Sequence, residues 1–347
     1  MLRGTLKFHP KQRPFRSSDL FGLVFKGLGA AYFTRKGFLS HSFCVHLHAF
    51  RQFQHTMLQP TDYTINANGR LIDLSRPQVM GIMNVTPDSF YAGSRKQTER
   101  EMAERANQIV AEGGTMIDVG AFSTRPGAPQ VSEQEEMERL RRGLAAVRRE
   151  QPGAVVSVDT FRPDVARMAV EEFGAAIIND VSEGNVNGAF GGTRGPGAEA
   201  EQTGAGGYPA MFRMMGRLKV PYILMSVKPG VSEMLAAFSA EVQQLRDLGV
   251  RDIILDPGFG FGKTLEQNYR LLAHLDRLHA LRLPLLVGVS RKSMVFRLLG
   301  GSPDTALNGT TAVHTLALAR GAAILRAHDV REAVECVKIY TAMADAG

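Results

Sequence analysis

The chain has 347 residues, of which 44% are hydrophobic, enough for a large buried core in one or two domains. Its formal net charge of +7 does not spread over that core: residues 1–60 hold nine Lys or Arg and one acid, which leaves −1 for the other 287 residues. A nucleic-acid-binding protein carries its basic patch on the folded domain, so we expect no nucleic-acid partner.

Residues 1–60 have the composition of a mitochondrial transit peptide, rich in Arg and almost free of acids. We expect a disordered leader and a mitochondrial protein, or a cytosolic one if translation starts at Met57. The run "LFGLVF" is cut by Lys26, and no apolar run reaches the roughly 20 residues of a spanning helix, so we expect no membrane segment. Cys44 and Cys336 are too few for a disulfide framework or a cysteine metal site.

Residues 61–78 alternate around Asn68-Gly69, which predicts a short hairpin. Beyond it the chain repeats short, continuously apolar runs, typical of parallel strands buried on both faces. The eight predicted strands are 79–85, 116–122, 155–160, 175–181, 222–226, 252–257, 285–290 and 322–329.

Segments of helical period separate these runs. Three of them start at candidate capping boxes, Thr98 with Glu101, Ser132 with Glu135 and Thr264 with Gln267. Eight strands alternating with helices over residues 61–347 predict a single (β/α)8 TIM barrel. A doubly wound open sheet is the rival architecture, but it normally has fewer strands and a glycine fingerprint after the first one.

Two glycine-rich stretches need separate interpretation. In "ILDPGFGFGKT" (254–264), Pro257 stands where a P-loop needs its first glycine, and the dinucleotide fingerprint also fails on spacing. Its lysine and threonine therefore start an ordinary crossover helix. Residues 184–207 are rich in glycine and predict a long loop insertion after the fourth strand.

Nearly every predicted strand ends in a polar or charged residue, and barrel enzymes place their chemistry at these ends. Buried acids and amides suit a small heterocycle with N–H donors, and cations at the mouth suit anionic groups such as phosphates. Asn84 beside a diphosphate would hold Mg2+, which takes few protein ligands. The strand-end residues are Asn84, Thr124, Arg125, Asp159, Asn179, Asp180, Ser226, Asp256, Ser290, Arg291, Lys292, Arg326, His328 and Asp329.

Seven motifs in chain order resemble those of the dihydropteroate synthase family, a (β/α)8 enzyme family of the folate pathway. The resemblance covers roughly residues 68–345. The motifs are "MGIMNVTPDSF" (80–90), "STRPG" (123–127), "SVDT" (157–160), "IIND" (177–180), "LDPGFGFGK" (255–263), "LLVGVSRKS" (285–293) and "RAHDV" (326–330).

The resemblance implies a transferase that joins 6-hydroxymethyl-7,8-dihydropterin diphosphate to p-aminobenzoate, giving 7,8-dihydropteroate and diphosphate. It implies a pterin site of Asp159, Asn179, Asp256, Phe261 and Lys292. It implies a diphosphate site of Asn84 with magnesium, Arg326 and His328. It implies a p-aminobenzoate site of Thr124, Arg125, Pro126 and Ser290, with Lys292, Arg326 and Arg125 serving catalysis.

The sequence departs from the family pattern at three places: Ser226-Val227 replaces His-Met, Phe122 replaces a glutamate, and Tyr91-Ala92 replaces a small polar residue and an aspartate. The departures keep open a catalytically weakened paralogue that acts as a binding or assembly protein. A pterin-binding methyltransferase is a second alternative, since such enzymes share the barrel and its Asp and Asn contacts to the pterin. The resemblance also implies a homodimer through the late helices, where residues 305–323 have a small-residue, apolar face.

Overall fold

The computed structural model describes residues 63–85, 92–121, 131–185 and 207–346, with the backbone alone for residues 92–98 and 185. The predicted leader, most of the predicted loop 184–207, and Phe122, Thr124, Arg125, Pro126 and Tyr91 lie outside these ranges. None of the helices described is long and apolar enough to cross a membrane.

Eight parallel strands close into a barrel, because β10 pairs with both β9 and β3. The predicted TIM barrel is thus confirmed, and the open-sheet alternative is wrong. The strands are β3 (Gln78–Asn84), β4 (Met116–Gly120), β5 (Val155–Asp159), β6 (Ile177–Asp180), β7 (Tyr222–Met225), β8 (Ile253–Asp256), β9 (Leu285–Val287) and β10 (Ala322–Ala327).

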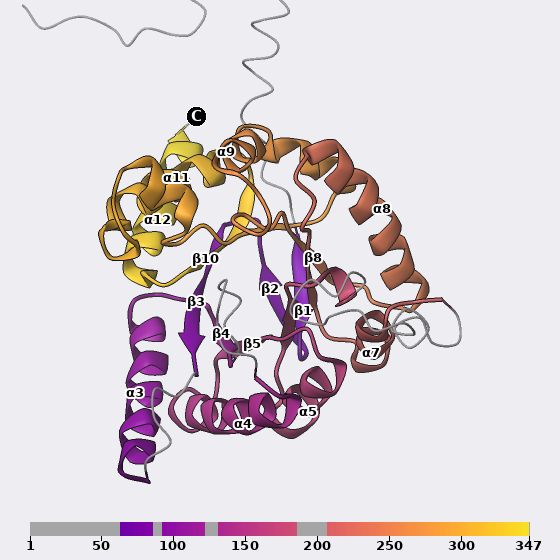
Figure 1. Cartoon of the computed structure of the whole chain (residues 1–347), viewed down its shortest axis with the longest axis vertical. Coiled ribbons are helices and arrows are strands. Elements are labelled where there is room, and N and C mark those ends of the chain that lie inside the picture. Colours follow the sequence, from indigo (N-terminus) through magenta and orange to yellow (C-terminus); the bar gives the residue numbers. More distant parts are fainter. Residues whose placement is uncertain (1–62, 86–91, 122–130, 186–206, 347) are drawn as a thin grey trace, which may run out of the picture. The chain divides into compact units, whose positions relative to one another are not determined.

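Helices surround the barrel on its outer side (Figure 1). They are α3 (Ala92–Ala111), α4 (Glu133–Glu150), α5 (Pro163–Phe173), α7 (Ala210–Leu218), α8 (Val231–Asp247), α9 (Leu265–Ala273), α10 (Ser293–Leu298), α11 (Leu307–Ala319) and α12 (Val330–Ala346), with the short 3-10 turns η1 (Glu183–Asn185), η2 (Leu275–Leu281) and η3 (Pro303–Thr305).

Two of the three predicted helix starts are observed. Ser132 accepts a hydrogen bond from the Glu135 amide, and Thr264 forms a reciprocal capping box with Gln267. The predicted box at Thr98 is wrong, because α3 already begins at Ala92 and Thr98 lies inside it. A Thr followed three residues later by Glu also occurs inside helices. The sequence alone therefore could not tell whether Thr98 marked a helix start.

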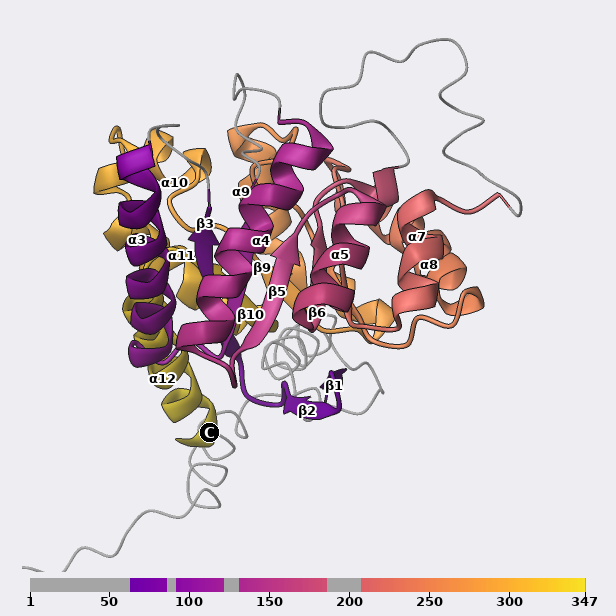
Figure 2. The same ribbon diagram turned by 90° about the horizontal axis from the view of Figure 1, so that it is seen from below.

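The predicted hairpin is confirmed and packs against the amino ends of the barrel strands (Figure 2). Strand β1 (Thr64–Ala67) pairs with β2 (Arg70–Asp73) across Asn68 and Gly69, whose φ angles of 52° and 82° fit a two-residue hairpin turn. The hairpin covers the amino-terminal end of the barrel, because Ile65, Ala67 and Leu74 are buried against it.

Side chains inside the barrel follow the period of two that strands impose. The first inward position of each strand is apolar, and together these positions form a dry floor: Met80, Met116, Val155, Ile177, Ile223, Ile254, Leu286 and Ile324. The outward side chains pack against the helices in a separate apolar layer. On five of the eight strands the next inward position is polar, and these polar side chains make up the candidate site.

Candidate active site

The candidate site is a polar layer that stands directly on the apolar floor. Asp118, Ser157, Asn179, Asp256 and Arg326 each follow a floor residue by two positions, so each points inward. The strand register agrees, since Asp118 pairs with Ser157 and Asp159 pairs with Asn179. Five strands therefore bring chemistry-bearing side chains into one interior.

Arg326 connects most of this layer. Its Nε donates to Asp118 Oδ2 at 2.6 Å, and its Nη2 donates to Asp159 Oδ2 at 2.7 Å. Asn179 Nδ2 donates to the same Asp118 oxygen at 3.0 Å. One guanidinium thus links two other strands of the barrel directly, and Asp118 extends the link to a third.

Burial and charge shift the ionisation of this group. Burial raises the pKa of Asp159 to about 7; Arg326 opposes the shift, while the Asp118 charge adds to it. Burial alone would lower the pKa of Arg326, but Asp118 and Asp159 together raise it. Arg326 therefore stays charged, and Asp159 can exchange a proton near neutral pH.

Three buried oxygens of the layer have no hydrogen-bond partner among the residues described: Asp118 Oδ1, Ser157 Oγ and Asn179 Oδ1. Leaving a buried polar atom unpaired costs about 1–3 kcal/mol. Their convergence on one interior makes them suitable acceptors for a ligand that brings its own N–H donors.

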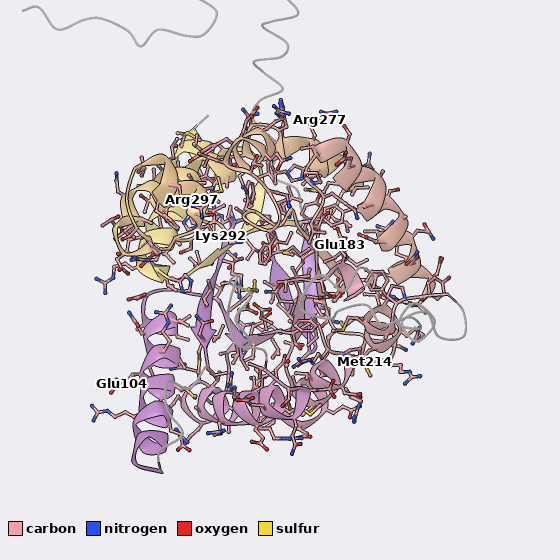
Figure 3. All side chains as sticks on the ribbon, in the orientation of Figure 1. Glu104, Glu183, Met214, Arg277, Lys292 and Arg297 are labelled. Atoms are coloured by element: carbon pink, nitrogen blue, oxygen red, sulfur yellow. The ribbon has the colours of Figure 1, made fainter. Side chains whose placement is uncertain are left out.

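Lys292 and Asp256 occupy the other side of the interior. Lys292 Nζ donates to the Phe259 carbonyl and lies 4.3 Å from the centre of the Phe261 ring. Asp256 Oδ1 accepts from the Gly258 amide at 2.7 Å. Burial lowers the pKa of Lys292 to about 8, an effect that Asp256 opposes. In Figure 3, Lys292 and Glu183 are labelled toward the middle of the ring of helices, and Glu104 and Arg277 at its outer edge.

The loops after β9 and β10 are tied together at the mouth. Ser290 Oγ accepts from the His328 amide at 3.1 Å, and Arg105 Nη2 donates to the His328 carbonyl at 2.6 Å. Arg291 grips Asp329 through two hydrogen bonds of 2.9 and 2.8 Å. The ion pair between Arg291 and Asp329 therefore joins the loop after β9 to the loop after β10.

Asn84 ends β3 with an exposed side chain. No group of three His, Cys, Asp or Glu side chains arranged to hold a metal occurs in the part of the chain that the structure describes. A lone exposed amide fits a cation whose remaining ligands come from a substrate and from water, as Mg2+ prefers, and does not fit an all-protein cage.

Two residues expected at the rim are placed differently. Asp180 points outward, where it accepts hydrogen bonds from Tyr222 and Ser182, because it follows the inward Asn179 by one position. Ser226 is fully buried and donates to Glu183 Oε1 at 2.9 Å. A strand end alone does not tell which face a side chain takes.

Asp118 is the site residue that reading strand ends missed, since it stands in the middle of "MIDVG". Its signal was present in the sequence: an acid two positions after Met116 must point the same way as that floor residue. Lys263 is a second omission. Its Nζ donates to the carbonyls of Ser226, Gly258 and Phe261, so it does more than precede a helix.

Comparison with known proteins places this architecture among pterin-binding enzymes. Residues 80–328 match the family described as "Pterin binding enzyme". The chain is 38% identical over 283 residues to the dihydropteroate synthase of Escherichia coli K12, covering 81% of this chain and 96% of that protein. It is 37% identical to the dihydropteroate synthase of Synechocystis, covering 77% and 90%.

Solved structures give the same result. The dihydropteroate synthase of Xanthomonas albilineans with 4-aminobenzoic acid superposes with a TM-score of 0.68 at 35% identity, covering 82% of this chain and 98% of that one. The same enzyme in complex with 7,8-dihydropteroate gives a TM-score of 0.65 at 31% identity, covering 81% and 98%.

Proposed function

This chain belongs to the pterin-binding enzyme family as a dihydropteroate synthase, a transferase of folate biosynthesis, and we propose how its own residues divide the reaction. The arylamine nitrogen of p-aminobenzoate attacks the methylene carbon of 6-hydroxymethyl-7,8-dihydropterin diphosphate. The bond from that carbon to the diphosphate oxygen breaks, and the amine loses one proton.

The observation that carries the proposal is the buried polar layer with its unpaired oxygens. A dihydropterin ring presents several N–H donors along its edges, and the layer supplies acceptors in Asp159, Asn179 and Asp256. The free Asp118 Oδ1 adds a further acceptor. Lys292 and Phe261 would close over the ring, the lysine facing its acceptor atoms.

The diphosphate would be held by His328 and Asn84 at the mouth and by Arg326, which would reach it from the polar layer below. Mg2+ would be held there by Asn84 together with diphosphate oxygens and water, and it would neutralise charge on the leaving group. Arg326 would add a charged hydrogen-bond donor to the diphosphate, because its two carboxylate partners keep it protonated at every physiological pH.

The p-aminobenzoate pocket would form from Thr124, Arg125, Pro126 and Ser290, with Lys292 reaching both substrates. Arg125 would pair with the benzoate carboxylate. Catalysis then consists of aligning the amine behind the methylene and stabilising the departing diphosphate, with no covalent intermediate on the protein.

We also propose a mitochondrial enzyme that forms a homodimer. The composition of residues 1–60 supports the compartment. The late helices support the dimer, because five large apolar side chains are exposed on the last three helices or directly after α10, and burial against a second copy would remove them from water. They are Leu298, Leu299, Leu316, Ile339 and Met343.

The direct test mixes the purified chain with both substrates and Mg2+ and measures 7,8-dihydropteroate. We expect turnover, and a fall of about 100-fold or more in kcat/KM for Lys292→Ala, which removes a contact to both substrates. Turnover by the native chain no higher than by Lys292→Ala would contradict the assigned roles and favour a weakened paralogue.

A further inference from the structure

Glu183 is a buried acid in an unfavourable backbone conformation next to the site. Its φ is 53°, in the left-handed region that non-glycine residues avoid, and its residue exposure is 1%. Such strain persists only where the surroundings hold it. Asp180 does so by accepting from the Ser182 amide at 2.8 Å and the Gly184 amide at 2.9 Å.

The held turn directs the Glu183 carboxylate to the end of β7. Its Oε1 accepts from Ser226 Oγ and from the Val227 amide, both at 2.9 Å. Its Oε2 lies 3.4 Å from Lys228 Nζ. One carboxylate thus fixes three consecutive residues where strand β7 turns into its loop.

Lys263 holds the same place from the opposite side. Its Nζ donates to the Ser226 carbonyl at 3.2 Å, the Gly258 carbonyl at 2.9 Å and the Phe261 carbonyl at 3.3 Å. Contact here is tight, because a Cβ on Gly258 would lie 2.1 Å from the Ser226 oxygen. The end of β7 is therefore clamped between the loop after β6 and the loop after β8.

Hydrogen bonds connect the end of β7 to residues of the proposed pterin site. The Ser226 amide donates to the Asp256 carbonyl at 2.9 Å, and the Gly258 amide donates to Asp256 Oδ1 at 2.7 Å. Phe261, whose carbonyl Lys263 holds, carries the ring over which Lys292 lies. A shift of Ser226 would move the backbone on which Asp256 and Phe261 depend.

We propose that Glu183, acting through Ser226, is a positioning residue for the pterin half of the site; this rests on the function proposed above. Glu183 touches no substrate in this assignment. Its role is to keep the loop after β8 in the geometry that aligns Asp256 and Phe261. A residue that only stabilises the fold would change the unfolding midpoint and affect both substrates alike.

The experiment compares Glu183→Ala, Glu183→Gln, Ser226→Ala and the double variant Glu183→Ala/Ser226→Ala in the full chain. We expect Glu183→Ala to raise the KM for the pterin diphosphate about tenfold, with the KM for p-aminobenzoate within twofold, and Ser226→Ala to do the same more weakly. Glu183→Gln keeps an acceptor oxygen and should stay within about threefold of the native chain.

The double variant tests whether the two residues act as one unit. Because both changes break the same link, we expect the double variant to resemble Glu183→Ala alone, so that the effects do not add. Glu266→Gln, the same change on an exposed side chain of α9, is the matched control and should match the native chain.

Calorimetric titration with an unreactive pterin gives a readout that does not depend on turnover. Weaker pterin binding in Glu183→Ala and Ser226→Ala, with rescue by Glu183→Gln, supports the proposal. Unchanged binding, equal loss for both substrates, or additive effects overturn it. Ser226→Ala removes one hydroxyl only and tests the link even where Glu183→Ala does not fold. Native turnover, measured in the same series, reports on the proposed function separately.

Discussion

Asp118 shows why a single residue can control several others in this interior. Its Oδ2 receives both Arg326 and Asn179, while its Oδ1 stays without a partner among the described residues. Away from water such charges interact strongly, so removing one partner leaves the other buried and uncompensated. The position of Arg326 therefore depends on Asp118 as much as on its own strand.

Replacing Asp118 by Asn tests this dependence. We expect kcat/KM for the pterin diphosphate to fall about 100-fold, because Arg326 loses one of its two carboxylates and Asn179 loses its acceptor charge. The pKa of Asp159 should move down, since the Asp118 charge helps to raise it. Steady-state kinetics over a pH series measure both effects. Asp164→Asn, on an exposed side chain, is the control, and an equal loss there would refute the argument.

Lys292 makes the reaction sensitive to alkaline pH. Its pKa is lowered to about 8 by burial; Asp256 and Asp159 favour its charged form, while Arg326 and Lys263 oppose it. The cationic form dominates below about pH 8, so kcat/KM for the pterin diphosphate should fall as the pH rises through that value. In Lys292→Arg the cation persists, and this alkaline limb should disappear from the measured profile. An unchanged limb would assign the titration to another group.

At the scale of single elements, the strands could be predicted from sequence because continuous apolar runs are distinctive. Each of the eight predicted runs contains the observed strand, apart from the single residue Gln78 at the start of β3. The faces were harder to predict. Asp180 and Asn179 are neighbours, yet one points outward and the other inward, and only the position of the barrel floor decides which.

Long-range pairing was beyond sequence reasoning for a different reason. Glu183 and Ser226 are 43 residues apart, and Arg326 and Asp118 are 208 apart. Local patterns carry no information on such partners, because closure of the barrel creates them. The sequence comparison showed only that Ser226 replaces a family histidine. It could not show that the Ser226 hydroxyl donates to the buried carboxylate of Glu183.

The loop after β8 offers a stability test at this scale. Gly258 has a φ of 65°, and an added Cβ would lie 2.1 Å from a backbone oxygen, so neither the conformation nor the space admits a side chain. We expect Gly258→Ala to lower the free energy of unfolding by about 2 kcal/mol or more. Gly153→Ala, where no atom lies within 4 Å, should change it by less than about 0.5 kcal/mol. Urea unfolding of both variants measures the difference, and equal values would contradict the close approach.

At the scale of the whole molecule, the apolar side chains at the amino ends of the barrel strands need a cover that excludes water. An open floor would expose Met80, Met116 and their neighbours to water. The hairpin of β1 and β2 supplies the cover through Ile65, Ala67 and Leu74. The compact unit that contains the barrel and its hairpin begins at Met57. The alignment with the Escherichia coli relative covers 96% of that protein with 81% of this chain.

A chain that starts at Met57 should therefore fold and turn over like the full one. The cover of the floor is retained in that chain, so we expect the urea midpoint and the kcat to match those of residues 1–347 within error, while the net charge falls from +7 to −1 because Arg3 to Arg51 are removed. Residues 1–56 would then serve for targeting and not for folding or catalysis. A loss of more than about 2 kcal/mol of unfolding free energy on truncation would mean that residues 1–56 stabilise the barrel itself.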